Sequence, residues 1–330
     1  MANGCPAAIH DNDSDTALPS ESLLSPGDFT PPGYLSSSVS LAQISGHIFQ
    51  GMYSVPHPHP HTRTNRLSRR TVADLYGELV RWRHEVPHHL RITPQTMGGD
   101  GGVARAIAFL DLRFQYAIIS VTRPLLFRLV TGVRDGSFGS LSIESRGFIT
   151  TYSDACAQSA RSSLLTLKFM RQNRLLNNVL WLDAFYILST AMVLLLEYLR
   201  SSSTAEAARV HECISILREL QPRGTGRNVL DSLMDLATFL GLDSIPANTV
   251  PSPDAPQGPG TGELHLYELF NSTPSSATPA TGVASPEISV NGMGGFGLGF
   301  PTQGGEGPGP NEFAWMDQVV RMAYAEFGPT

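Results

Sequence analysis

Three residues in the stretch HEVPH, residues 84–88, have the types and spacing of a zinc protease motif. His84, Glu85 and His88 fit H-E-x-x-H, in which two histidines on one helix face bind zinc and the glutamate acts as general base. That chemistry needs an unbroken helix between the histidines. Pro87 lacks an N–H and disfavours the helical conformation of Val86, so we expect the helix to stop near Glu85. The sequence therefore predicts no zinc site here.

The other metal-binding and nucleophilic residue types are scattered. His57, His59 and His61 alternate with proline in VPHPHPHTRTNR, an extended loop without a Cys or carboxylate partner, which is typical of a solvated linker. The cysteines are odd in number and far apart: Cys5, Cys156 and Cys213. They build neither a disulfide framework nor a zinc cluster, and they favour a reducing compartment.

No complete catalytic constellation is visible either. The sequence has no G-x-S-x-G and no phosphate-binding glycine loop before a helix. GMGGFGLG at 292–299 follows no strand and directly precedes no helix, which indicates a linker. We predict no catalytic, cofactor-binding or metal-binding residues and no cofactor, and an enzyme is the less favoured alternative.

The composition narrows the class of protein further. The 330 residues are 41% hydrophobic, which can supply a sizeable core, and only 16% charged, because 31 Gly and 24 Pro gather near the ends. The net charge of −6 argues against a polyanion-binding chain. Asp11, Asp13 and Asp15 stand where a secretory leader would be basic, and no long apolar run follows them, so we expect no secretory signal.

One apolar segment, residues 179–199, has the length of a membrane span. Asp183 and Glu197 interrupt it, and each charge in mid-membrane costs about 2.5–3.5 kcal/mol on insertion scales. We therefore expect a helix buried in a helical domain and no contact with a membrane.

The spacing of apolar residues predicts an all-α fold: a multi-helix domain over residues 39–245 between Pro/Gly/Ser-rich ends. We expect disorder over 1–38, a disordered linker over 246–310 and a short amphipathic helix over 311–330. Helices are predicted over 40–54, 71–86, 103–123, 149–171, 177–200, 205–220 and 227–240, with Gly241 as a C-cap. Thr71 should open the second and Pro124 should kink or end the third. In the second helix, Trp82 joins the apolar stripe, whereas Arg81 and Arg83 should face solvent.

Three stretches of the predicted domain together resemble a known family. LAQISGHIFQGMYS (41–54) is similar to an early Leu-rich helix ending in Tyr-Ser, and LYGELVRWRHEVPHHLR (75–91) to a Trp-containing helix followed by Val-Pro. FLDLRFQYAIISVTRPLLF (109–127) is similar to a helix ending in Arg-Pro-hydrophobic. In this order and spacing they resemble the regulatory "middle homology" domain of fungal transcription factors that carry a binuclear zinc cluster.

The resemblance implies a nuclear transcriptional regulator of a metabolic or biosynthetic gene set. It would act through protein partners, namely the transcription machinery or a DNA-binding regulator, and as a possible homo- or heterodimer. The chain departs from the family in one respect: Cys5 stands alone in its first 150 residues, where the family has a six-cysteine zinc cluster. We therefore expect no specific DNA binding by this chain alone, owing either to a truncated gene model or to a regulator without its own DNA-binding module.

An alternative function and the role of one basic motif remain open. In the alternative reading, the chain is a partner-binding co-regulator or decoy with no direct DNA role. The basic run NRLSRR (65–70) is either a nuclear import signal or a solvated loop before the second helix, and a run so short favours the loop.

Overall fold

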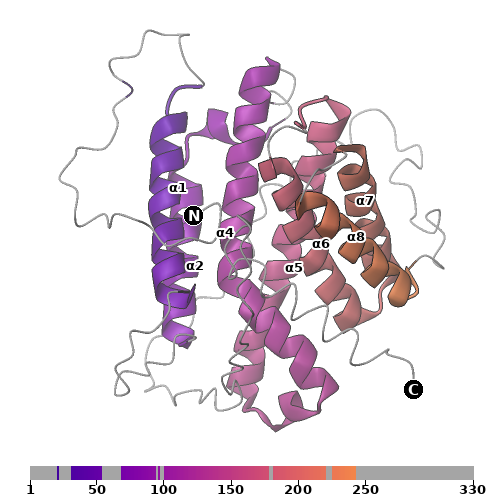
Figure 1. The fold of residues 1–330 in the computed structure, drawn as a ribbon. Helices are drawn as coiled ribbons and strands as arrows, with labels where there is room; N and C mark the ends of the chain where they lie inside the picture. The colour runs from indigo at the N-terminus through magenta and orange to yellow at the C-terminus, as the bar shows by residue number, and fades with distance from the viewer. Residues whose placement is uncertain are drawn as a thin grey trace, which may run out of the picture.

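The computed structural model describes residue 21 and residues 31–53, 68–93, 96, 100–177, 181–220 and 225–242. Within these residues every regular element is a helix and no strand occurs, which confirms the predicted all-α class (Figure 1). The segments predicted as the linker (246–310) and the short C-terminal helix (311–330) lie outside the described residues, as does most of 1–38.

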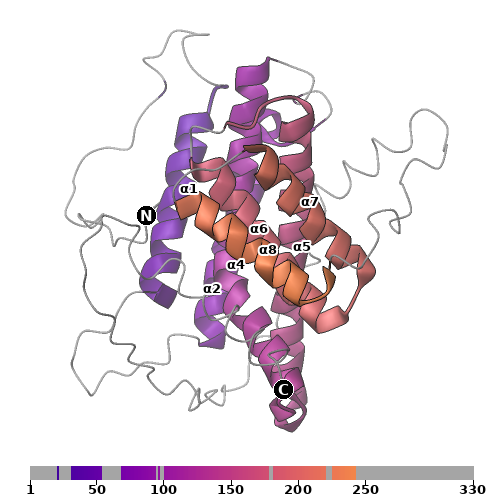
Figure 2. The same ribbon diagram turned by 45° about the vertical axis from the view of Figure 1, so that its right-hand side comes forward.

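Six helices lie side by side and a seventh crosses them (Figures 1 and 2). They are α1 (Tyr34–Ile48), α2 (Arg69–Glu85), α4 (Gly101–Arg134), α5 (Ile143–Gln172), α6 (Trp181–Ser201), α7 (Thr204–Leu220) and the crossing helix α8 (Thr225–Phe239). Three short elements complete the fold: the π-helical turn η3 (Phe49–Tyr53) and the 3-10 turns η4 (His88–Leu90) and η5 (Ser137–Ser140). Figure 2 shows α8 running obliquely over α6 and α7, the two helices it contacts.

Helix α4 is the central helix and separates two hydrophobic cores. It contacts α1 and α2 on one side and α5 and α6 on the other. Its Leu110 and Phe114 belong to the core shared with α1 and α2, whereas its Leu112 and Ile119 belong to the core shared with α5 to α8. A helix that is apolar nearly all round must be covered on nearly all sides, which explains why α4 takes the middle position.

Several predicted helix starts were wrong: α5 begins at Ile143, not at residue 149, α6 begins at Trp181, not at residue 177, and α1 and α2 also begin earlier than predicted. Helix α1 begins at Tyr34, inside the segment expected to be disordered, because the Glu21 carboxylate accepts hydrogen bonds from the backbone N–H groups of Gly33 and Leu35 at its open end. Helix α2 begins at Arg69, not at Thr71. Its N-cap is Ser68, whose hydroxyl accepts the Thr71 N–H at 3.0 Å, so the capping side chain stands three residues before the predicted one.

We predicted that Pro124 would kink its helix or end it. The helix does not end there, because α4 continues through Pro124 to Arg134. A proline inside a helix removes the N–H that would bind the carbonyl four residues earlier, here that of Ser120. The Tyr53 hydroxyl, at the end of η3, donates to that carbonyl at 2.6 Å. A side chain from another element thus satisfies the group that proline leaves open, and the helix can continue.

Two helices are long and apolar enough, by length and composition, to cross a membrane: residues Gly101–Arg134 and Leu182–Ser201. Within the fold, 67% and 78% of their most apolar windows are buried. The two charges of the segment 179–199 are enclosed as well, with Asp183 bound by Arg105 and Glu197 by Arg161 and Arg200. These features are those of core helices, as expected for residues 179–199.

Candidate functional site

The zinc-type motif lies at the end of α2, and the helix stops where Pro87 predicts. Helix α2 ends at Glu85, and Val86 has left the helical conformation with φ −57° and ψ 127°. His84 and Glu85 are exposed on the last turn, and His88 is exposed in η4 beyond the turn. The two histidines therefore do not share one continuous helix, which the motif's chemistry requires. His57, His59 and His61 lie outside the described residues.

The two described cysteines are core residues. Cys156 and Cys213 are both fully buried, on α5 and α7. Burial raises the pKa of the Cys156 thiol to about 12, and burial likewise raises the pKa of Cys213. A nucleophilic cysteine needs the opposite, a lowered pKa in an electropositive and accessible place. Both thiols therefore act as small hydrophobic groups; Cys5 lies outside the described part of the chain.

Arg83, predicted to face solvent, is instead buried, which corrects the assignment of the polar face of α2. Its guanidinium lies over the Phe114 ring, 5.3 Å from the centroid, and its Nη2 is 3.4 Å from Oδ1 of the buried Asp111. Thr166 of α5 donates to the other oxygen of Asp111 at 3.0 Å. Burial raises the pKa of Asp111, and the positive charge of Arg83 opposes that rise. The pair links α2, α4 and α5.

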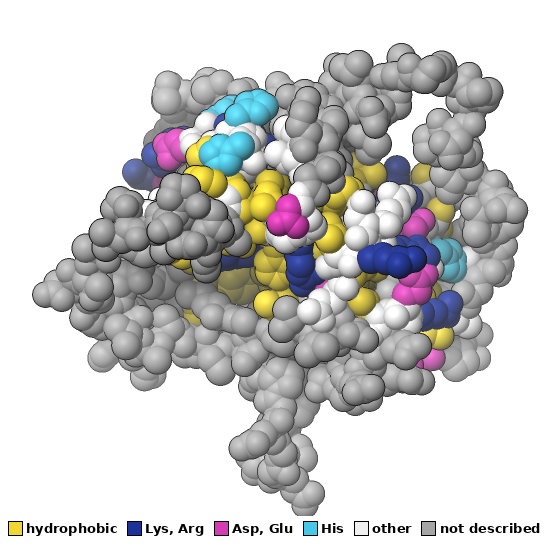
Figure 3. Space-filling view, turned by 90° about the horizontal axis from the view of Figure 1, so that it is seen from above, with side chains coloured by type: hydrophobic (Ala, Val, Ile, Leu, Met, Phe, Trp, Pro, Cys, Tyr) yellow, Lys and Arg dark blue, Asp and Glu magenta, His cyan; other side chains and the backbone are white. Residues whose placement is uncertain are grey.

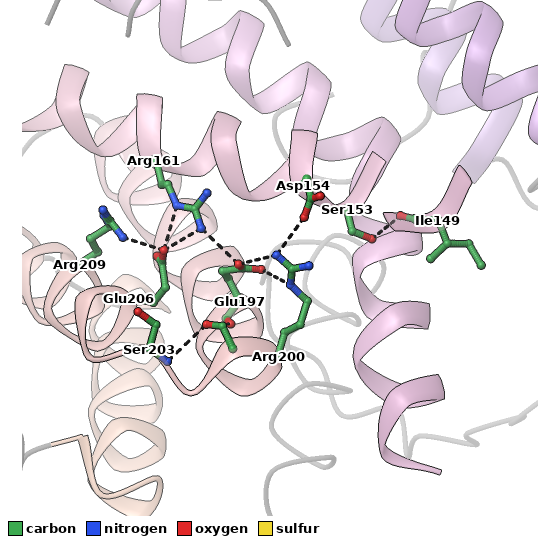
Figure 4. A network of polar contacts seen from close by, with 10 residues as sticks. Ile149, Ser153, Asp154, Arg161, Glu197, Arg200, Ser203, Glu206 and Arg209 are labelled. Carbon is green, nitrogen blue, oxygen red and sulfur yellow. Dashed lines mark hydrogen bonds and ion pairs between the residues drawn. The ribbon is translucent and has the colours of Figure 1, made fainter. Parts of the chain in front are cut away.

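A larger network of charges joins α5, α6 and α7 (Figure 4). Glu197 accepts hydrogen bonds from Arg161 and Arg200, and Glu206 accepts them from Arg161 and Arg209. Asp154 pairs with Arg200 at 2.9 Å, so three arginines meet three carboxylates. Both glutamates are buried and each is bound by two arginines, which is an arrangement that fixes the helices rather than one that moves protons.

The three stretches compared above with the fungal regulatory domain contribute to one hydrophobic core, which includes Trp82. The indole N–H donates to the Ser37 carbonyl at 3.1 Å and to Ser40 Oγ at 3.0 Å, both on α1. Its ring stacks on Phe114 of α4 with centroids 5.3 Å apart. The bond from Tyr53 to the Ser120 carbonyl links the first stretch to the third. Residues distant in the sequence thus form one packed unit, which we call the Trp82 cluster.

One face of α4 is only partly covered by the other described helices, whereas most of the rest of its surface is buried. Between positions 104 and 131 its half-buried residues recur every three or four positions, whereas nearly all others are buried. These residues are Arg105, Phe109, Arg113, Tyr116, Ser120, Pro124, Phe127 and Thr131. We call this line of residues the α4 stripe. Spacings of three and four place its members on one side of the helix, so α1 and α6 leave a continuous line of side chains between them.

The walls of the α4 stripe come from α1 and α6. On the α6 side, Phe185 packs on Tyr116 with ring centroids 5.0 Å apart, and Tyr186 packs on Phe109 at 5.4 Å. On the α1 side, the Ser38 carbonyl accepts a long hydrogen bond of 3.4 Å from Arg113. Seen from above, hydrophobic side chains run across the molecule between a group of histidines and a group of paired charges (Figure 3).

The two arginines of the α4 stripe differ in their partners. Arg105 binds both carboxylate oxygens of Asp183 at 3.1 Å and lies over the Phe109 ring. Arg113 has no carboxylate within ion-pair distance among the described residues. Burial raises the pKa of Tyr186, and the charge of Arg113 opposes that rise, which places Arg113 beside the aromatic side chains. The stripe thus combines half-buried aromatic side chains with a positive charge that has no acidic partner among the described residues.

Sequence reasoning found part of this arrangement. The predicted apolar positions Ile107, Leu110, Phe114 and Val121 are buried, and the half-buried stripe is their complement on the same helix. A repeat of arginine and aromatic residues at 105, 109, 113 and 116 could have revealed it, because such residues prefer half-covered positions.

Comparisons with protein-family models, with curated proteins and with the solved structures found no match to this chain.

Aromatic side chains and arginines are the residue types that contribute most to binding at protein interfaces. The described residues hold no group of three His, Cys, Asp or Glu side chains placed to bind a metal. The α4 stripe contains both aromatic side chains and arginines, with Phe109 and Tyr116 beside Arg105 and Arg113.

Proposed function

We propose that this chain is a transcriptional regulator that works in the nucleus through protein partners and has no catalytic role. The observation that supports this best is the Trp82 cluster. The three stretches compared with the fungal regulatory domain contribute to one hydrophobic core, in which Trp82 stacks on Phe114, and Tyr53 binds the Ser120 carbonyl beside it.

The position of each distinctive residue also has a physical reason. Trp82 needs a partner for its N–H, and α1 supplies two. Pro124 leaves a carbonyl open, and Tyr53 binds it, while the Arg123 guanidinium lies over the Tyr53 ring at 5.9 Å. These residues therefore depend on each other for the packing of α1, η3, α2 and α4. This supports the view that the resemblance extends over a folded unit and is not limited to short, separate sequence motifs.

Protein partners fit the surface better than DNA does. The net charge of −6, together with the pairing of eight described arginines with carboxylates, leaves little charge to neutralise phosphates. Arg69, in the basic run 65–70, ion-pairs with Glu144 and lies over Phe148, and Arg70 lies in the first turn of α2. The two therefore belong to the helix start, not to a loop, and an import role for this run stays a proposal.

A reporter assay in a fungal host tests the regulatory role. The full chain fused to an unrelated DNA-binding domain should change transcription from that domain's site at least several-fold. The same fusion with Trp82→Ala, compared at equal protein abundance, should lose the effect because the Trp82 cluster holds α1, α2 and α4 together. A fusion that leaves the reporter unchanged while the protein accumulates in the nucleus would overturn the proposal.

The second candidate, a co-regulator or decoy without a direct DNA role, is favoured by the α4 stripe, which offers a surface for a protein segment. It predicts that the unfused chain alters the activity of a DNA-bound regulator in the same host. It also predicts that the purified chain protects no site in a footprint at physiological salt. A specific footprint by the purified chain would contradict both candidates, since each assumes no DNA binding by this chain alone.

A further inference from the structure

The α4 stripe has the shape and chemistry of a docking surface whose occupant can come from the same chain. It follows one helix face from Arg105 to Ser120, which is about 22 Å at 1.5 Å per residue. Along it lie Phe109 and Tyr116, which are half-buried, and Arg113, which has no carboxylate partner among the described residues. A stripe that the described helices leave half-covered is a surface that another segment can cover.

The sequence of residues 311–327 complements this stripe. Phe313, Met316, Val320, Ala323 and Phe327 are spaced three or four apart, which is the pattern of one apolar helix face. As a helix these residues would extend about 24 Å, close to the length of the stripe. Three acids (Glu312, Asp317, Glu326) against one base (Arg321) give the segment a net charge of −2, opposite in sign to Arg113.

The connecting chain is long enough for this segment to reach the stripe. The described domain ends at Leu242, and Asn311 follows 69 positions later (311 − 242). A Gly/Pro-rich chain of that length has a root-mean-square span of about 40–50 Å. Helix α4 itself, with 34 residues, is about 50 Å long. Tethering also raises the local concentration of the segment to about the millimolar range for short flexible linkers, and to less for a long one.

We propose that residues 311–327 of this chain dock as a helix along the α4 stripe, with their aromatic side chains on Phe109 and Tyr116 and their acids toward Arg113. A helix this short is only marginally stable alone in water and gains its order from packing. Docking covers apolar side chains on both sides and gives Arg113 the acidic partner that it lacks among the described residues. The inference does not rest on the transcriptional role, because it concerns a contact within one chain.

Amide hydrogen exchange of the full chain, followed by mass spectrometry, tests the contact. Peptides covering 311–327 should exchange at least tenfold more slowly than an unstructured peptide of the same sequence. Arg113→Glu should remove that protection. Adding E312R, D317R and E326R to Arg113→Glu should restore it, because the reversed charges attract again. Arg70→Glu, at a side chain 92% exposed on α2, is the matched control and should leave the protection unchanged.

Each alternative outcome is decisive. Peptides from α5 report whether Arg113→Glu still folds; if it does not, Arg113→Gln together with Tyr116→Ser is used in the same comparison. Protection of 311–327 that disappears on dilution means that a second copy is the occupant, which overturns the proposal. Protection that persists in Arg113→Glu places the segment elsewhere. If residues 311–327 of the unmodified chain exchange at the rate of the unstructured peptide, the proposal is overturned, and an external partner becomes the candidate for the stripe. This result would not change the outcome expected in the reporter assay.

Discussion

The two halves of the domain are held together by different kinds of contact. Around α1, α2 and the first half of α4, an aromatic stack and hydrogen bonds to neutral groups centre on Trp82, and a buried ion pair, Arg83–Asp111, lies beside them. Between α5, α6 and α7, three arginines and three carboxylates lie on and between the helices, with Glu197 and Glu206 buried among them. Apolar stacking depends on shape, whereas buried ion pairs depend on complete pairing. The first half should therefore suffer most from lost volume and the second from lost charge.

The largest effect is expected for Trp82→Ala. The change removes a large ring that is 4% exposed and leaves a cavity beside Phe114, which should lower the free energy of unfolding by about 3–5 kcal/mol. Urea denaturation followed by circular dichroism measures it. Trp82→Phe is the control, because it keeps most of the stacked area and loses only the N–H bonds to Ser37 and Ser40. Equal stability of the alanine variant and the unmodified chain would show that α1 and α4 do not pack on this ring.

A smaller but distinct effect is expected for Glu197→Gln. The change leaves Arg161 and Arg200 without their shared charge, but both are about a quarter exposed and can turn toward water. We therefore expect a loss of about 2–3 kcal/mol, below the roughly 3–5 kcal/mol for breaking a fully enclosed pair. Glu212→Gln is the control: Glu212 binds Arg171 and Lys168 at the surface and should contribute about 0–1 kcal/mol. Equal losses in the two variants would mean that the network of Figure 4 is no stronger than a surface pair.

Tyr53→Phe should have a still smaller effect, and one that depends on Pro124. Without the hydroxyl, the Ser120 carbonyl loses its bond, which should cost about 0.5–1.5 kcal/mol because Tyr53 lies where water can partly replace it. In a Pro124→Ala background the helix supplies its own N–H to that carbonyl, so the same change should cost less. A double-mutant cycle measures the coupling. A coupling energy of zero would separate the tyrosine from the proline.

The difference between the halves also explains what could be read from the sequence. The helix over α2, its stop at Pro87 and the burial of Trp82 followed from spacing and backbone chemistry, since these are local properties. The burial of Arg83 did not follow, because its partner Asp111 lies on another helix and only the fold brings the two together.

The same limit applies to the helix termini and to the candidate site. The start of α1 depends on Glu21, more than a turn away in sequence, and the passage of α4 through Pro124 depends on Tyr53. The α4 stripe was hidden for a related reason. Its residues are the positions of α4 that α1 and α6 fail to cover, so it is a property of the packing and not of α4 alone.

The smallest effect is expected from Asp111, and it appears as a dependence on pH. Burial raises the pKa of Asp111 in the folded chain above its value in the unfolded chain. The folded state therefore holds the proton more tightly, and the stability that this provides is fully present below the unfolded pKa and is lost as pH rises through the folded pKa.

Asp111→Asn removes the titration but keeps a side chain that Thr166 can reach. The unfolding free energy of the unmodified chain minus that of the variant should therefore fall as the pH rises above about 4, measured by urea denaturation at a series of pH values. The same difference measured for Asp135→Asn should instead rise as the pH increases toward about 4 and stay level above it, because hydrogen bonds from Ser137 lower the pKa of that exposed carboxyl. A difference for Asp111 that rises with pH would show that Arg83 outweighs burial, and that the charged pair fixes α2 to α4 as firmly as the networks fix the other half.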